Sequence, residues 1–324
     1  MRNSLLALTV LLIAGGLLAG CSGVRYASAP PLAFEDIDYG FPTERALEAP
    51  QIAYIDEGQG EQTILLVHGL ASNAGFWRYS IPLLAEAGYR VIAVDLPGFG
   101  KSDKGAYPYD MTFYANALSR FIRALNLEPV IYAGHSMGGQ IGITLALEEP
   151  ELIHRLVLAA PAGIEPFGPG ESAWLANVLT VDGITNAPEE AIRANLALNF
   201  HRWDPAWEWM VEERARMAKT PEMTKFSYAV LRSVHGMLDQ PTTARLPEVT
   251  VPTLIVYGQY DRLIPNQYLH PGFPRDVFQK GHDLIPQSQL VEIPNAGHMI
   301  QIERPRAFTD AVVNYLREGA VTAR

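Results

Sequence analysis

Short apolar segments rich in β-branched residues recur along the chain and alternate with longer segments of helical periodicity. Most of the short segments are apolar at nearly every position, which is typical of strands that are covered on both faces of a sheet. The predicted strands span residues 63–67, 90–94, 130–133, 155–159, 253–257 and 290–293.

Helical patterns occupy several of the intervals between these strands, at residues 77–87, 111–125, 137–147 and 304–317. A repeat of strand, helix and strand predicts a mostly parallel sheet with right-handed crossovers and helices on both faces. Between residues 164 and 246 helical periodicity continues without a convincing strand. We therefore expect an α/β fold with a helical cap at 165–246, inserted between the core segments 51–164 and 247–324.

The first fifty residues differ in pattern from the rest of the chain. Arg2 precedes an uncharged apolar run at residues 5–18 that ends in small residues, which is typical of an export signal, here assigned to residues 1–20. Such a run is too short for a comfortable membrane span. Residues 21–50 are rich in Ala and Pro, so we interpret them as a tether and an entry segment, with the folded domain starting near Gln51.

Cys21 is the only cysteine in the chain and directly follows Leu-Ala-Gly at 18–20. This tetrapeptide resembles the lipobox of bacterial lipoproteins, which implies cleavage before Cys21 and attachment of fatty acyl chains, such as palmitate, to it. Several acyl chains would hold the protein on a membrane. Ser22 resembles an outer-membrane sorting residue, which implies the periplasmic face of that membrane if the cell is Gram-negative. The alternative is an incidental thiol after an ordinary signal peptide or an uncleaved anchor.

Composition and charge narrow the classes of function. The 324 residues are 48% hydrophobic and 19% charged, which is typical of a folded globular protein. The formal net charge of −10 offers no basic surface for a phosphate backbone, so nucleic acid is not an expected partner. A single cysteine also excludes an internal disulfide.

The strongest chemical motif is Gly-His-Ser-Met-Gly-Gly at residues 134–139, which follows the predicted strand 130–133 and opens a predicted helix. This context is typical of a nucleophile elbow, in which a serine sits on a sharp, strained turn between glycines. Ser136 is therefore the candidate nucleophile. The backbone N–H of Met137, at the start of the helix, is a candidate donor to an oxyanion.

A nucleophilic serine needs a base, and the base needs a group that orients it. His298 follows the last predicted strand, and Asp261 follows the strand 253–257, so both belong at the sheet edge that carries Ser136. The alternative for Asp261 is a surface carboxylate paired with Arg262, with Asp239 as the reserve candidate. The other histidines are expected to point away, brace a loop or lie at the surface: His68, His135, His154, His201, His235, His270 and His282.

Two glycine-containing segments after strands remain. His68-Gly69-Leu70 follows the strand 63–67, and its turn predicts the Leu70 N–H as the second oxyanion donor. Residues 95–102 end in Gly-Lys-Ser, similar to a phosphate-binding loop, but Asp95 stands where that motif needs a glycine. We therefore interpret residues 95–102 as a structural turn.

These motifs occur in one order: Val-His-Gly at 67–69, Asp-x-Pro-Gly-x-Gly-x-Ser at 95–102, the elbow at 134–139, Asp261, and Asn-Ala-Gly-His at 295–298. Together they resemble the α/β-hydrolase superfamily over residues 51–316. The resemblance implies acyl transfer through Ser136, His298 and Asp261 without a metal or organic cofactor. Superfamily members that are haloalkane dehalogenases or epoxide hydrolases carry aspartate at the elbow, so Ser136 argues against both.

The superfamily still leaves several functions open. The leading interpretation is an esterase or lipase-like enzyme that acts on a small-molecule ester or lipid. Hydrolysis of a C–C bond in a vinylogous diketone and hydrolysis of a lactone use the same triad, and a non-catalytic, membrane-anchored binding lipoprotein is the alternative of another class. The predicted cap is rich in aromatic residues, which form an apolar pocket, contact lipid or simply pack: Phe167, Trp174, Phe200, Trp203, Trp207, Trp209 and Phe226.

Overall fold

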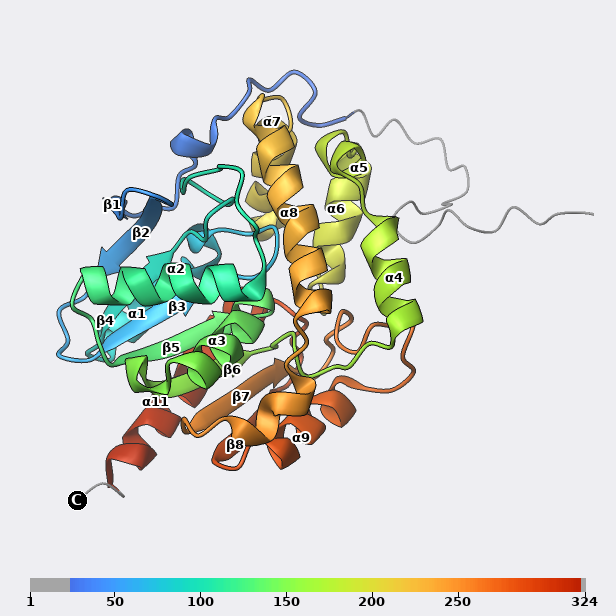
Figure 1. Cartoon of the computed structure of the whole chain (residues 1–324). Helices are drawn as coiled ribbons and strands as arrows, with labels where there is room; N and C mark the ends of the chain where they lie inside the picture. Colours follow the sequence, from blue (N-terminus) through green and yellow to red (C-terminus); the bar gives the residue numbers. More distant parts are fainter. Residues whose placement is uncertain (1–23, 322–324) are drawn as a thin grey trace, which may run out of the picture.

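The computed structural model describes residues 24–321 (Figure 1). Cys21, Ser22 and the predicted export signal lie outside the described residues. Within the part that is described, no helix is both long enough and apolar enough to cross a membrane.

An eight-stranded sheet forms the centre of the molecule, with the strand order β1-β2-β4-β3-β5-β6-β7-β8. Strand β2 is antiparallel to its neighbours β1 and β4, and all other neighbouring pairs are parallel. This arrangement confirms the predicted α/β class with its mostly parallel sheet. The strands are β1 (Glu44–Ala46), β2 (Ile52–Glu57), β3 (Thr63–Val67), β4 (Arg90–Val94), β5 (Val130–His135), β6 (Ile153–Ala159), β7 (Thr253–Gly258) and β8 (Ser288–Ile293).

Helices cover both faces of this sheet (Figure 1). On one side α1 (Ile81–Glu86) packs against α11 (Pro305–Val321), and on the other α2 (Met111–Ala124) packs against α3 (Met137–Glu148). Helix α9 (Pro274–Leu284) contacts β7 and β8, and the short α10 (Ile300–Glu303) precedes α11. Helix α1 is shorter than the predicted segment 77–87, because Pro82 has no N–H and is tolerated only in a first turn.

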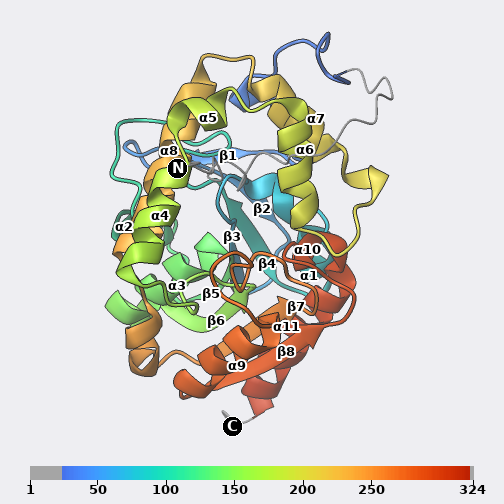
Figure 2. The ribbon, with the colours of Figure 1, turned by 90° about the vertical axis from the view of Figure 1, so that its right-hand side faces the viewer.

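Between β6 and β7 the chain forms five α-helices, which lie together above one edge of the sheet (Figures 1 and 2), and two short 3-10 helices. We refer to residues 165–246, which contain the five α-helices, as the cap. The α-helices are α4 (Pro169–Val178), α5 (Val181–Thr185), α6 (Glu189–Leu198), α7 (Trp209–Met217) and α8 (Glu222–Asp239). Part of the cap, around Phe200 and Val211, shares a small apolar cluster with Phe76 and Met299 of the core.

The segment before Gln51 differs from what its sequence pattern indicates. Phe34, Ile37 and Tyr39 are each only 1% exposed and belong to the main core cluster, and β1 pairs with β2. The folded part therefore starts well before Gln51. Periodicity missed this because a few apolar side chains on an irregular segment fill the core without forming a regular pattern.

Candidate active site

Ser136 stands between β5 and α3 in a strained backbone conformation, with φ 52° and ψ −116°. Two glycines allow the strand and the helix to approach each other at this turn. A Cβ on Gly134 would lie 2.2 Å from the Gly138 carbonyl oxygen, and one on Gly138 would lie 2.5 Å from the Val67 carbonyl oxygen. Neither position has room for a side chain, so the glycine spacing of the motif follows from steric need.

Backbone hydrogen bonds fix this turn without using the serine side chain. The Ser136 N–H donates to the Ala159 carbonyl at 2.9 Å, and the Ser136 carbonyl accepts from the N–H groups of Gly139 and Ala162 at 2.8 and 3.0 Å. Ser136 is partly exposed, although its neighbours in sequence are buried. The hydroxyl is therefore presented on a rigid turn.

His298 and Asp261 form a buried pair, with His298 Nδ1 2.7 Å from Asp261 Oδ2. The other carboxylate oxygen, Oδ1, accepts from the N–H groups of Leu263 and Ile264 at 2.8 and 3.1 Å. Asp261 therefore orients the ring, and the alternative ion pair with Arg262 is absent among the described residues. With Nδ1–H donating to the carboxylate, Nε2 is the nitrogen left to accept a proton.

Ser136 and His298 line the same cavity, which has a volume of about 470 Å³. Within the described chain their side chains make no direct hydrogen bond. Catalytic hydrogen bonds are often long without substrate and tighten when a substrate is bound, so this geometry is compatible with proton transfer. Asp239, the reserve candidate for the acid, lies at the end of α8 and has no such contact with His298.

The two predicted oxyanion donors belong to segments that adjoin Ser136 in the structure. Met137 is the first residue of α3, where the N–H has no acceptor inside the helix. Gly69 packs against the serine, since a Cβ on it would lie 3.0 Å from Ser136 Cβ, and Leu70 lines the cavity. These placements are compatible with the predicted role of the Leu70 and Met137 N–H groups.

Two other histidines, His68 and His135, contact backbone carbonyl groups next to the site. His68 accepts from the Leu96 N–H at 3.0 Å through Nε2, and burial lowers its pKa to about 4. His135 Nε2 is 3.0 Å from the His298 carbonyl oxygen, and the rings of these two histidines are 4.8 Å apart. Burial lowers the pKa of His135 well below its ordinary value, so the ring next to His298 stays neutral. The support from His135 was not predicted, because its neighbour His298 is remote in sequence.

The cavity walls are mostly apolar and come largely from the cap. Trp174 and Phe167 line the cavity, whereas Trp207 packs on Phe200 at 4.4 Å and Trp209 packs under Arg78 at 3.7 Å. One of the four cap tryptophans therefore faces the cavity. Other apolar lining residues are Leu175, Val178, Leu179, Leu198, Val234, Met237, Leu238, Leu263 and Ile264.

One carboxylate also lines this cavity. Glu165 Oε1 accepts from the Asn266 N–H at 2.8 Å and lies 2.5 Å from His270 Nδ1. Burial raises the pKa of Glu165, and the hydrogen bond with Glu165 raises the pKa of His270. Among the lining residues, all of which lie in the described chain, there is no lysine or arginine. The sequence held no signal for this pair.

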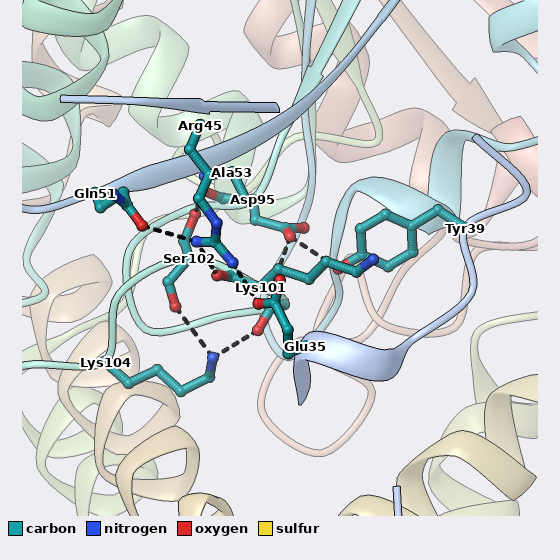
Figure 3. A network of polar contacts seen from close by, with 10 residues as sticks. Glu35, Tyr39, Arg45, Gln51, Ala53, Asp95, Lys101, Ser102 and Lys104 are labelled. Carbon is teal, nitrogen blue, oxygen red and sulfur yellow. Dashed lines mark hydrogen bonds and ion pairs between the residues drawn. The ribbon is translucent and has the colours of Figure 1, made fainter. Parts of the chain in front are cut away.

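Side chains and backbone groups of the turn at residues 95–102 form a polar network with the segments around it (Figure 3). Asp95 accepts from Ala74 N–H, Lys101 N–H and the Tyr39 hydroxyl at 2.7 to 2.8 Å. The Ser102 hydroxyl bridges the Asp95 carbonyl and the Ala53 N–H. These contacts make the segment a structural turn. Within residues 24–321, no cluster of three or more His, Asp or Glu side chains could hold a metal ion.

Comparison with known proteins places these features in a family. Residues 62–305 match the model of the alpha/beta hydrolase fold. The chain is 32% identical over 276 residues, covering 84% of this chain and 89% of the other, to 2-hydroxy-6-oxo-6-(2'-aminophenyl)hexa-2,4-dienoic acid hydrolase of Metapseudomonas resinovorans.

Two solved structures are similar to the whole fold. A probable hydrolytic enzyme from Pseudomonas aeruginosa aligns with a TM-score of 0.78 and 28% identity, covering 90% of this chain and 99% of the other. A bacterial membrane phospholipase A aligns with a TM-score of 0.70 and 25% identity, covering 86% and 87%.

Proposed function

The chain belongs to the alpha/beta hydrolase family, and from this premise we propose that it cleaves carboxylic esters with an uncharged, largely apolar acyl group. Ser136 is the proposed nucleophile, His298 the base and Asp261 the group that orients the base. No second protein or bound group is required for this assignment. Its support is the contact between His298 and Asp261, together with the cavity that Ser136 and His298 share.

The proposed reaction has two halves. His298 Nε2 takes the Ser136 proton as the serine oxygen attacks the ester carbonyl, and the N–H groups of Leu70 and Met137 stabilise the oxyanion. The protonated ring then donates the proton to the departing alcohol, which leaves an acyl group on Ser136. Water, activated by the same ring, releases the acid and restores the serine.

The proposal of an uncharged acyl group rests on the charged residues that line the cavity. Several relatives are named as hydrolases of dienoic or dienedioic acids, which bear a carboxylate. An unpaired carboxylate in an apolar cavity costs several kcal/mol. Among the described residues that line this cavity there is no lysine or arginine to pair with such a carboxylate, and Glu165 adds a carboxylate of the protein.

Hydrolysis of a C–C bond is the second candidate, because the relative with 32% identity is named for a dienoic acid substrate. The catalytic triad would be the same, so the substrate alone separates the two functions. Lactone hydrolysis would fit an uncharged cavity as well and falls within the proposed ester chemistry.

Turnover of matched substrates tests the proposal. We expect the purified protein to react with a fluorophosphonate probe at Ser136 and to hydrolyse p-nitrophenyl esters of acetate to octanoate. For a 2-hydroxy-6-oxo-dienoic acid, kcat/KM should be lower by at least about 100-fold. The reason is that a buried carboxylate without a partner costs about 3 kcal/mol or more. Faster cleavage of the acid would favour the C–C bond hydrolase. A folded protein inert to the probe and to all substrates would favour the binding lipoprotein.

We also propose that the protein is exported and anchored by lipid on Cys21. Support comes from the sequence motif and from the similar membrane phospholipase A. The segment after Val24 packs on the cap, where the Tyr26 N–H donates to Glu189 and Lys219 donates to the Tyr26 carbonyl. Cys21 precedes Val24 by three residues, so even a fully extended chain would keep the lipid-bearing Cys21 within about 11 Å of Val24. Incorporation of labelled palmitate that Cys21→Ser abolishes would support the anchor, and unchanged labelling would contradict it.

A further inference from the structure

Arg214, on cap helix α7, makes an unusual contact with the loop that follows β3. Its Nη2 donates to the carbonyl oxygen of Ala71, the residue after Leu70. The guanidinium also lies over the Phe226 ring, 4.6 Å from the ring centre. Within the described chain no carboxylate lies within ion-pair distance of Arg214, and the adjacent Glu213 contacts Arg78 instead, at 3.6 Å. A cation in apolar surroundings is thus directed at one backbone carbonyl.

The loop that receives this contact is held in a strained form. Ala71 has a φ of 55°, a region that residues other than glycine rarely adopt and that costs about 1 kcal/mol or more. The preceding Gly69 carbonyl accepts from the Ser72 hydroxyl at 3.0 Å and lies 2.7 Å from His68 Nδ1. The carbonyls on both sides of Leu70 are therefore held by side chains, which limits the directions that the Leu70 N–H can take.

Only the contact from Arg214 joins this loop to the cap among these hydrogen bonds. We propose that Arg214 is a positioning residue for the oxyanion site: it holds the Ala71 carbonyl so that the Leu70 N–H points to the oxygen of the attacked ester. This inference rests on the proposed ester hydrolysis. It makes the cap part of the catalytic geometry as well as the wall of the cavity.

The charge of Arg214 persists under working conditions. Burial lowers its pKa to about 10, and the neighbouring Glu213 partly opposes this shift. Arg214 is therefore a cation at neutral pH, and a charged donor makes a stronger hydrogen bond to a carbonyl than a neutral one does. Loss of this contact should displace the loop and leave the cap folded, because the cap also packs through Phe200 and Val211.

The effect should appear in the transition state and not in ground-state binding. We expect Arg214→Met to lower kcat for p-nitrophenyl butyrate by about 10- to 100-fold with KM within about twofold, because a small misplacement of an oxyanion donor has this effect. Affinity for an alkyl trifluoromethyl ketone, which forms a tetrahedral oxyanion on the serine, should fall by the same factor. Affinity for the parent methyl ketone should not change.

Two further variants complete the test. Arg216→Met, on the same helix, removes contacts with Pro30 and Glu212 and should leave kcat and both ketone affinities unchanged. Arg214→Lys keeps a charged donor, so it should recover most of the kcat and of the trifluoromethyl ketone affinity. If Arg214→Met does not fold, Arg214→Lys decides the matter through a fall of about two- to fivefold in both quantities.

Two results would overturn the inference. One is an unchanged kcat in folded Arg214→Met, and the other is an equal loss of affinity for the two ketones, which would indicate a purely structural role. Both presuppose that the wild-type protein hydrolyses esters. A wild-type protein without activity would instead contradict the proposed function, so the two failures are distinguishable.

Discussion

Two glycine-containing turns follow β4 and β5, the two strands on either side of β3. The polar side chains of the first turn bind other protein groups, whereas the serine of the second faces a cavity. In the turn after β4, the Asp95 carboxylate accepts hydrogen bonds from Tyr39 and Lys101 (Figure 3) and a third from the Ala74 N–H, and the Ser102 hydroxyl both donates and accepts. In the turn after β5, backbone contacts fix Ser136, but its hydroxyl has no hydrogen bond within the described chain.

The difference teaches what separates a reactive turn from a structural one. A side chain whose hydrogen bonds are all made inside the protein stabilises the fold and has nothing left for a ligand. A side chain that faces a cavity from an equally rigid turn remains able to form hydrogen bonds with a substrate. Both turns carry serine and glycine after a buried strand, so what separates them in the structure is whether the polar side chain faces the cavity.

The largest expected effect contrasts the two serines. Ser136→Ala should lower kcat/KM for p-nitrophenyl butyrate by about 10⁴-fold or more, as removal of a catalytic serine does, with little change in the free energy of unfolding. Ser102→Ala should keep the activity but lower the free energy of unfolding by about 1–3 kcal/mol, because the Ala53 N–H loses its acceptor. Urea denaturation and steady-state kinetics on both variants measure the contrast.

The comparison would break if the effects were exchanged. Activity that persists in Ser136→Ala would refute the assigned nucleophile. A loss of activity in folded Ser102→Ala that matches Ser136→Ala would mean that the turn after β4 takes part in the reaction.

The second contrast concerns two buried carboxylates, Asp261 and Asp95. In Asp261→Asn the amide oxygen can still accept from Leu263 and Ile264, but the amide NH₂ faces His298 Nδ1 and favours the wrong tautomer. We expect a loss of about 10⁴-fold in kcat with a nearly unchanged stability. Activity within tenfold of the wild type would contradict the role of Asp261.

Asp95→Asn should behave in the opposite way. Donors surround both oxygens of Asp95, so either orientation of an amide brings its NH₂ against another donor. The free energy of unfolding should fall by about 2–4 kcal/mol, while the folded fraction at low temperature keeps its turnover. A stability equal to that of the wild type would show that the network in Figure 3 contributes little.

How far the sequence predicts these features depends on how local each one is. Six of the eight strands and the elbow were predictable, because alternation of buried strands with helices and the spacing of Gly134 and Gly138 follow from nearby residues, whereas β1 and β2 were not predicted. The position of Ser136, Asp261 and His298 at one edge follows from parallel strands. The packing of Phe34 in the core and the contact of Arg214 with Ala71 were not predictable, because each joins residues far apart in sequence through irregular segments.

Glu165 lies between the two cases of the comparison. Like Asp95 it has partners in the protein, Asn266 and His270, and like Ser136 it lines the cavity. His270 belongs to the segment between β7 and α9, and its Nε2 also lies 3.3 Å from Glu171 on α4. The pair therefore connects the cap to the segment after β7 beside the cavity. Its strength should depend on pH, because a protonated His270 binds the carboxylate more strongly than a neutral one.

The smallest expected effect is this pH dependence. The pKa of His270 is raised in the folded protein, first by its hydrogen bond with Glu165, so its contribution to stability is fully present below the unfolded value of about 6.5 and is lost as pH rises through the folded value. More acidic conditions are avoided because burial raises the pKa of Glu165, the partner of His270. His270→Gln should lower the free energy of unfolding by about 1 kcal/mol at pH 6, or Tm by about 2 °C, and progressively less toward pH 9.

His154→Gln serves as the control, since burial lowers the pKa of His154 and no carboxylate contacts it among the described residues. A Tm difference for His270→Gln that stays constant from pH 6 to 9 would mean that the charge of His270 does not contribute to the contact, and Glu165 would then belong with Asp95 on the structural side of the comparison.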